Sequence, residues 1–572
     1  MTSPVPILPV QAKPRNPSWA IAIVISFVLS VAIVLPCFWL GNASGHDFDF
    51  HTASWLDVAY QWKQGIVYPR WAAWMNHGFG EPRFIFYPPL SWILGAALSL
   101  VLPGIWIPLA FIVLVQTFAG FAAFSLLRRL VNHREAILGA ACYVVNPYAL
   151  LLIYIRSDFA EQLACAIFPL VLLAALHLAN LLDSPSHKCS PLALFGIPFA
   201  AVWLANAPAG VIASYSLALV FVWAAITQRS WRIALRGVYG LVLGFSLTCF
   251  YLIPAACEQR WVNIGQALSG GLLPSDNFLF TYTADPEHTR FNWIASFCAI
   301  LLFLLCAFAA LLSRRFVTFA DSGDPRQKAW RALLALASAA TLLMLRFTLP
   351  VWNSFPKLRF VQFPWRWMSI LALVCACFLA SALQKRRGWA WFVLLLLFSV
   401  ALAHFLGNNT WWDRDGIATF QAAITDGKGF EGTDEYDPLG DDHTNLPPNA
   451  PPAMILPTEP EHPRVPDAHV HIEKWTTEEK TLRVASPAPA RLALRLLNYP
   501  AWRVEVNGTP IVPDRAENSN QMVIPIAAGS STVHVRFVRT PDCTLGILIS
   551  VLSLLLTIAL LFAAWKRGSA RA

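Results

Sequence analysis

The stretch AIAIVISFVLSVAIVLPCFWLGNASGHDFDFHTASW (residues 20–55) decides the class of fold. Its first part, residues 20–41, has no charged residue and is longer than the about 20 apolar residues that cross a bilayer core. Two aspartates and two histidines follow within residues 46–51, where such a helix leaves the membrane. The apolar run is too long for a signal-peptide core and no A-x-A cleavage site follows it. The stretch therefore predicts an uncleaved membrane anchor with ionisable side chains at its exit.

The composition of the whole chain is that of a polytopic membrane protein. Of 572 residues, 56% are hydrophobic and only 13% are charged, which is too apolar for an ordinary soluble protein. The net charge of +9 comes from Lys and Arg clustered in short loops between apolar runs, so we expect no nucleic-acid partner. The eleven cysteines include no CxxC pair, which predicts buried free thiols and neither a disulfide framework nor a zinc site.

Hydropathy and loop charge together predict the topology. The short basic loops at 128–135, 228–232, 313–331 and 384–387 and the tail 565–572 all fall on one side, which the positive-inside rule assigns to the cytoplasm. Both termini are then cytoplasmic. The protein is predicted to lie in the inner (plasma) membrane of the cell. Twelve spans are predicted, near residues 19–41, 104–128, 135–154, 159–182, 191–205, 208–228, 233–256, 291–313, 328–349, 366–384, 388–406 and 543–565.

This topology divides the chain into three parts. Residues 1–406 form the helical bundle, residues 407–542 an extracytoplasmic domain, and residues 543–572 the last span and its tail. Within the first outer loop, 42–103, the segment 89–103 is apolar but short, so we predict a helix on or dipping into the outer face.

The extracytoplasmic domain begins with a predicted short helix at 414–427, followed by an acidic, proline-rich stretch at 431–452. From about residue 465 onward, alternating apolar and polar residues predict strands at 468–475, 481–486, 490–499, 501–506, 521–526 and 531–538. Asn507-Gly508 lies between two of them and is a strong hairpin signal. The prediction is a small antiparallel β-sandwich.

The exit of the first span carries the first candidate site. Asp47 and His51 are four positions apart, on one side of a helix that begins there, whereas Asp49 points elsewhere. A carboxylate at a membrane surface, flanked by Phe48, Phe50 and Trp55, is a candidate general base. The alternative is that Asp47 only caps the helix.

Three outer segments place arginines among aromatic residues and carboxylates. Guanidinium groups bind phosphate in a bidentate way, so their convergence on one cleft would build an anion site. The simpler alternatives are interfacial anchoring by Trp and Tyr and an internal ion pair of Arg156 with a nearby acid. The substrate-binding candidates are His51, then Arg70, Glu81, Arg83 and Tyr87, then Arg156, Asp158 and Glu161, and finally Arg359, Gln362 and Arg366.

Some classes of function lack support in the sequence. The predicted spans have almost no Asp, Glu or Lys near their middles, which argues against ion-coupled transport. No P-loop, G-x-S-x-G, H-E-x-x-H or Rossmann fingerprint occurs, so nucleotide-driven chemistry is not predicted.

The order of one span, an acidic outer loop, YPPLSW, a surface helix and a many-span bundle resembles the GT-C fold of membrane glycosyltransferases. More narrowly, HDFDFH, GFGEPRFIFYPPLSW, NPYALLLIYIRSDFAEQLA, LRFVQFPWRW, GTDEY and NYPAWRVEVNG resemble a bacterial family of membrane proteins labelled pyruvoyl-tetrahydropterin-synthase-related. That label names a soluble pterin enzyme, but the sequence shows no His-rich zinc cluster. The resemblance thus indicates fold better than function.

The GT-C resemblance implies a sugar donor linked to polyprenyl phosphate and a catalytic aspartate in the first outer loop. Asp47 is the first choice for this base and Asp49 the second. Because some members bind a divalent cation through D-x-D, the resemblance leaves a cation at Asp47 and Asp49 open. Arg156 or Arg366 would hold the donor phosphate. Glu435 and Tyr436, in GTDEY, would contact the acceptor.

The predicted function is transfer of a sugar from a polyprenyl-phosphate donor to an extracytoplasmic glycan, lipid or protein acceptor. The alternative is a non-catalytic flippase for lipid-linked glycans or a scaffold for cell-envelope assembly. Passive passage of a lipid would not need charges at the middle of the membrane.

Overall fold

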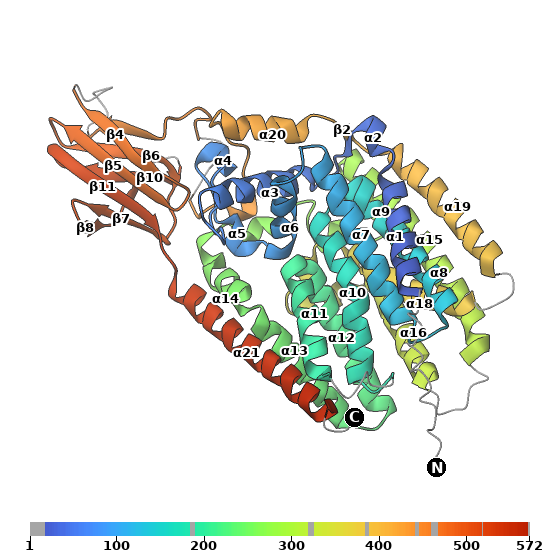
Figure 1. The fold of residues 1–572 in the computed structure, drawn as a ribbon. Coiled ribbons are helices and arrows are strands. Elements are labelled where there is room, and N and C mark those ends of the chain that lie inside the picture. Colours follow the sequence, from blue (N-terminus) through green and yellow to red (C-terminus); the bar gives the residue numbers. More distant parts are fainter. Residues whose placement is uncertain are drawn as a thin grey trace, which may run out of the picture.

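The structure is a computed structural model that describes residues 18–182, 189–317, 325–383, 388–440, 446–458, 467–516 and 519–569. A bundle of long helices carries a β-sandwich beside one end, and the last helix, α21, returns from the sandwich along the bundle (Figure 1). The basic loop predicted at 384–387 and part of the one at 313–331 lie outside the described residues.

Long apolar helices form the bundle. In the described part of the chain, nine spans are long and apolar enough to cross a membrane, and two bent helix pairs raise the number to eleven. The prediction of a polytopic helical membrane protein is thereby confirmed. The principal helices of these nine spans are α1 (Ser18–Val34), α7 (Trp106–Leu127), α8 (His133–Val144), α10 (Phe159–Leu178), α12 (Ala207–Thr227), α15 (Pro286–Val317), α18 (Met368–Ala382), α19 (Gly388–Gly407) and α21 (Pro541–Ser569).

Three of the twelve predicted spans differ from straight, full-length helices. The segment at 191–205 is α11 (Pro191–Ala205), whose 15 residues fall short of a bilayer core. The span at 233–256 is a pair, α13 (Trp231–Leu247) and α14 (Cys249–Glu258), bent by 75°. The span at 328–349 is α16 (Pro325–Leu343), which bends by 92° into η5 (Arg346–Thr348) and α17 (Leu349–Ser354).

Local chemistry accounts for both bends. At the first, the Thr248 hydroxyl donates to the Phe245 carbonyl at 2.8 Å and so satisfies an acceptor near the break. At the second, Pro350 lies in the first turn of α17, where its missing N–H is tolerated. Apolar composition alone predicts that a segment is buried, but not that it is straight.

The end of the bundle next to the sandwich carries residues 41–104 and 407–440, and we call it the loop face (Figure 1). The surface helix predicted at 89–103 is α6, and the helix predicted at 414–427 is α20. Helix α1 begins, and α21 ends, at the opposite end of the bundle. The remaining elements of this face are α2 (Cys37–Leu40), β1 (Asn42–Ala43), α3 (Phe48–Lys63), α4 (Met75–Gly78), α5 (Arg83–Phe86), α6 (Pro89–Ser99), β2 (Trp412–Asp413), α20 (Gly416–Thr425) and η8 (Asp434–Tyr436).

Two antiparallel sheets form the sandwich, and the apolar side chains of both share one buried cluster. The predicted hairpin is confirmed, since Asn507 and Gly508 have φ of 52° and 78° and join two paired strands. The first sheet has the order β3 (Ala453–Pro457), β6 (Ala490–Leu497), β10 (Gln521–Ile526), β9 (Asp514–Arg515), and the second β4 (His469–Trp475), β5 (Glu479–Ser486), β11 (Gly529–Phe537), β7 (Trp502–Val506), β8 (Thr509–Ile511). Strands β3, β8 and β9 have no counterpart among the predicted strands.

The sandwich is docked on the segment of residues 42–103 through aromatic side chains. The buried Trp71 ring lies 5.8 Å from Tyr499, 5.5 Å from Trp502 and 5.7 Å from Phe537, measured between ring centroids. The Tyr499 hydroxyl also donates to Glu258 of α14 at 2.5 Å. These contacts hold the sandwich and the residues that precede it against the loop face.

Candidate active site

A cavity of about 1360 Å³ lies at the loop face. Its walls include the start of α3, the segment joining η1 (Leu152–Arg156) to α10, the loop before α18, and residues 430–436. The predicted site residues that line the cavity are Asp47, Asp49, Arg83, Tyr87, Arg156, Asp158, Gln362, Arg366, Glu435 and Tyr436.

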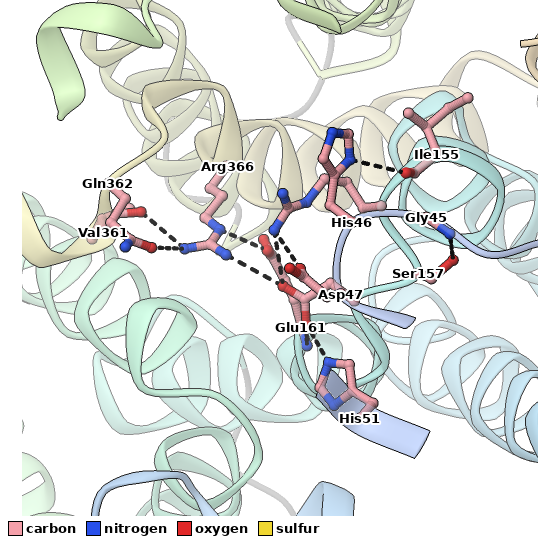
Figure 2. A network of polar contacts seen from close by, with 12 residues as sticks. Gly45, His46, Asp47, His51, Ile155, Ser157, Glu161, Val361, Gln362 and Arg366 are labelled. Atoms are coloured by element: carbon pink, nitrogen blue, oxygen red, sulfur yellow. Dashed lines mark hydrogen bonds and ion pairs between the residues drawn. The ribbon is translucent and has the colours of Figure 1, made fainter. Parts of the chain in front are cut away.

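Asp47 and Arg156 form an ion pair at the floor of this cavity (Figure 2). The backbone supports the pairing, because the Asp47 N–H donates to the Arg156 carbonyl at 3.0 Å. The Asp47 side chain is 28% exposed, whereas that of Arg156 is 7% exposed. The guanidinium group also lies over the Phe363 ring, 5.0 Å from its centroid. The guanidinium group is therefore held between the Asp47 carboxylate and the Phe363 ring.

Arg366 lies beside this pair and joins two acids of α10 (Figure 2). Its Nη2 lies 3.3 Å from Asp158 Oδ2 and its Nε 2.9 Å from Glu161 Oε2. On its other side it donates to the Val361 carbonyl at 3.0 Å and to Gln362 Oε1 at 3.4 Å. The side chains of Arg366, Asp158 and Glu161 are 5%, 3% and 1% exposed, so this is a buried charge network.

Asp158 is the centre of this network. Its Oδ1 accepts the Glu161 N–H at 2.9 Å, which caps α10, and lies 3.5 Å from His51 Nε2. Burial alone would raise the pKa of this carboxyl, but His51 and the charges of Arg366 and Arg156 hold it below its usual range. Asp158 therefore stays ionised and neutralises guanidinium charge.

The close approach of residues 45–47 to residues 155–157 depends on Gly45. Its N–H donates to Ser157 Oγ at 2.9 Å, and Ser157 has a left-handed backbone with φ of 52°. A Cβ on Gly45 would lie 2.2 Å from the Ile155 carbonyl oxygen. This contact fixes where Asp47 meets Arg156.

Gly45→Ala is expected to push these two segments apart and to lower the free energy of unfolding by about 1–3 kcal/mol, as overpacking does. Thermal unfolding of the purified protein measures this. The control is Gly265→Ala, because a Cβ there meets nothing within 4 Å. Equal midpoints for the two variants would contradict the prediction.

A second buried pair joins the first outer loop to the segment before the sandwich. Arg83 Nε donates to Glu81 Oε1 at 2.6 Å, and both side chains are at most 3% exposed. The pair then holds Thr433 at two points, since Glu81 Oε2 accepts the Thr433 N–H at 2.9 Å and Arg83 donates to the Thr433 hydroxyl. Residues 430–436 are thereby fixed as one wall of the cavity.

Glu435 lies on this wall, partly buried. Burial, with the carboxylates of Glu81 and Asp434 adding to it, raises the pKa of Glu435 to about 7, although Arg83 acts in the opposite direction. A pKa raised in the folded state means that the stabilising contribution is complete at low pH and disappears as pH rises through about 7.

Backbone hydrogen exchange in residues 430–437 is therefore expected to accelerate between pH 6 and pH 8, beyond the intrinsic chemical effect of pH. Glu435→Gln should remove that acceleration because the amide does not ionise. Glu473→Gln is the matched control, since Glu473 pairs with Arg483 on the exposed face of the sandwich. An unchanged pH profile in the Glu435 variant would refute the link.

Asp49 differs from Asp47 in having no hydrogen bond or ion pair within the described part of the chain. It is exposed and lines the cavity. Partial burial of the Asp49 carboxyl raises its pKa above the ordinary value, and the nearby Asp413 carboxylate on β2 adds to this effect. Unlike Asp47, Asp49 can therefore accept a proton without losing an ion pair.

Several predicted site residues do not line the cavity. Arg70 binds the sandwich, where it donates to the Val538 carbonyl at 3.0 Å and lies 3.4 Å from Glu478. Arg359 is exposed on the loop before α18. His51, Glu81 and Glu161 lie behind the lining residues, where their side chains hold Asp158, Arg83 and Arg366, respectively.

Other lining residues were not predicted, among them His46, His288, Arg290 and Lys357. Lys357 has a left-handed backbone with φ of 60°, which no local sequence signal indicates. His46 is adjacent to Asp47, so its position beside the site could have been inferred from the opening motif.

The donors present do not fit a protein-held divalent cation at Asp47 and Asp49. Asp47 is already neutralised by Arg156, and a cation there would compete with that guanidinium group. Among the described residues, no group of three or more His, Cys, Asp or Glu side chains is arranged to hold a metal ion. No chemical step is therefore assigned to a cation.

The sequence matches the model of a protein family. The model of the 6-pyruvoyl-tetrahydropterin synthase related domain, described as a membrane protein, matches residues 84–408, more than half of the chain. The chain belongs to this family. The match covers the bundle from α5 to α19. The first span and the sandwich lie outside the matched residues.

No curated protein matches this family member. Among solved structures, the crystal structure of the apo oligosaccharyltransferase of Archaeoglobus fulgidus is similar at 14% sequence identity, with a TM-score of 0.37. The match covers 69% of this chain and 56% of that one, so the chain spans about half the length of that enzyme.

Proposed function

We propose that this protein is a membrane glycosyltransferase that moves a sugar from a polyprenyl-phosphate donor to an acceptor hydroxyl on the extracytoplasmic side of the inner membrane. The observation that carries the proposal is the convergence of Asp49, a carboxylate without an ion pair among the described residues, and several cationic side chains in a single cavity at the loop face. The sequence resemblance to GT-C enzymes supports the same reaction class.

The reaction is a single displacement at the anomeric carbon. The acceptor hydroxyl attacks this carbon, Asp49 takes the hydroxyl proton, and the bond to the phosphate oxygen breaks with its electron pair leaving on the phosphate. One displacement inverts the configuration of the sugar. Because phosphate is already a good leaving group, orientation and charge neutralisation supply most of the rate.

Asp49 serves better than Asp47 as the base. A proton on Asp47 would weaken its ion pair with Arg156, whereas Asp49 has no such pair to lose and its pKa is raised. This reverses the order that the resemblance suggests. Asp47 then acts as a positioning residue that fixes the guanidinium group of Arg156.

The cations divide into two kinds. Arg156 and Arg366 are already paired with Asp47, Asp158 and Glu161, whose carboxylates neutralise their charge. Lys357 and Arg290 line the same cavity and have no ion pair within the described ranges. Arg290 donates to Asn409 Oδ1 at 2.6 Å, so the charges of these two side chains are not neutralised by an acid and can contact the donor phosphate.

The test uses the purified protein in lipid nanodiscs with a radiolabelled sugar on a short polyprenyl phosphate and a cell-envelope extract as acceptor. Transfer predicts that label leaves the lipid fraction and enters the extract. In proteoliposomes, movement of intact labelled lipid across the bilayer without consumption would favour the flippase alternative instead. Neither consumption nor movement would exclude both.

A further inference from the structure

The cavity has a second wall whose chemistry differs from that of the arginine side. It consists of the start of α3, residues 83–88 and residues 430–436, and we call it the acidic wall. Its one lining cation, Arg83, is paired with Glu81. Three lining carboxylates, those of Asp49, Glu431 and Glu435, have no ion-pair partner among the residues that the structure describes.

Aromatic rings complete the acidic wall. The Phe50 ring lies 4.7 Å from the Tyr87 ring and 6.4 Å from the Tyr436 ring, measured between centroids. The Phe86 and Tyr436 rings are parallel within 3°, with centroids 5.9 Å apart. These aromatic side chains thus line the cavity beside the carboxylates of the acidic wall.

Tyr436 shows that this wall is built for a polar ligand. Its side chain lines the cavity and the residue is only 9% exposed, yet its hydroxyl has no hydrogen-bond partner within the described ranges. The hydroxyl is therefore available to form a hydrogen bond with a ligand in the cavity. The rigid hold of Glu81 and Arg83 on Thr433 keeps Tyr436 and Glu435 in place without a ligand.

These features match a carbohydrate. The C–H face of a sugar ring packs on aromatic rings, and its hydroxyl groups donate to carboxylates and to phenol oxygens. Three uncompensated carboxylates repel an acidic sugar and favour a neutral or amino-bearing one. Protein and lipid acceptors lack this combination of a flat apolar face and a ring of hydroxyl groups.

We propose that the acidic wall is the acceptor subsite and that the acceptor is a neutral or amino-bearing glycan. The inference rests on the proposed transferase function, which it makes more specific. Because Asp49 belongs to the same wall, the reacting hydroxyl of this glycan is presented to the base, while the donor phosphate faces the cations across the cavity.

The test measures binding without donor and without turnover. Purified protein in nanodiscs is applied to an array of immobilised neutral, amino-bearing and uronic-acid-bearing oligosaccharides. The expected result is binding to neutral or amino-bearing glycans. Glu435→Gln and Tyr436→Phe should each weaken this binding about tenfold, because each variant loses one hydrogen bond to the glycan. Glu473→Gln, on the exposed face of the sandwich, should bind as the unmodified protein does.

Each outcome decides the inference. Binding confined to acidic glycans, no binding to any neutral or amino-bearing glycan, or unchanged binding by both wall variants overturns it. Thermal unfolding midpoints of the variants exclude loss through misfolding. If label leaves the donor lipid but no glycan binds the wall, the inference fails alone; if glycans bind but no transfer occurs, the transferase proposal fails.

Discussion

Asp49→Asn is expected to lower sugar transfer by about 100- to 10,000-fold, the range that one general base contributes. The fold should not change, because Asp49 is exposed and its side chain makes no hydrogen bond or ion pair within the described residues. In the unmodified protein the rate should fall as pH falls through the raised pKa of Asp49, since only the ionised carboxylate accepts a proton.

The measurement is initial consumption of labelled donor at saturating concentration. Asp426→Asn serves as the matched control, because Asp426 is exposed and pairs only with Lys428. Full activity in the Asp49 variant, together with loss in Asp47→Asn, would return the role of base to Asp47. Full activity in both would remove the enzymatic proposal.

Arg366→Met is expected to lower the free energy of unfolding by about 3–5 kcal/mol, the usual result of removing one partner from a buried charge network. The reason is that Asp158 and Glu161 would lose a guanidinium group that contacts both at 3.3 Å or less. Methionine keeps much of the side-chain volume, so packing loss contributes little. Unfolding by SDS in mixed micelles measures the difference.

Arg359→Met is the control, because Arg359 lies in the same loop but is exposed. The triple variant Arg366→Met, Asp158→Asn, Glu161→Gln should recover part of the loss, since it removes the uncompensated charges as well as the cation. If the Arg366 and Arg359 variants unfold alike, the network does not stabilise the fold.

The general architecture could be read from the sequence because hydrophobicity acts over whole segments. The run at 20–41, the surface helix at 89–103 and the Asn507-Gly508 hairpin each follow from local composition or turn chemistry. The bends at Thr248 and after Leu343 were missed, because a bent apolar segment and a straight one have the same hydropathy.

The site could be predicted only in part. Arg156, Asp158 and Arg366 come together as expected from their places at the ends of helices. Arg70 could not be distinguished from them, because its partner Val538 is 468 positions away in the sandwich. Asp47 pairs with Arg156, and this pairing changes the choice of base. It depends on the close approach of the backbone at Gly45, which the spacing of the acids in the sequence does not indicate.

The short pairing of β1 with β2 links Asn42 and Ala43 to Asp413 and Trp412. A ribosome delivers the first strand some 370 residues before its partner, so during most of synthesis the acids next to the first span have no completed cavity around them. Assembly of the centre is thereby tied to a late stage of insertion, and chains that stop before residue 412 would reach the membrane without it.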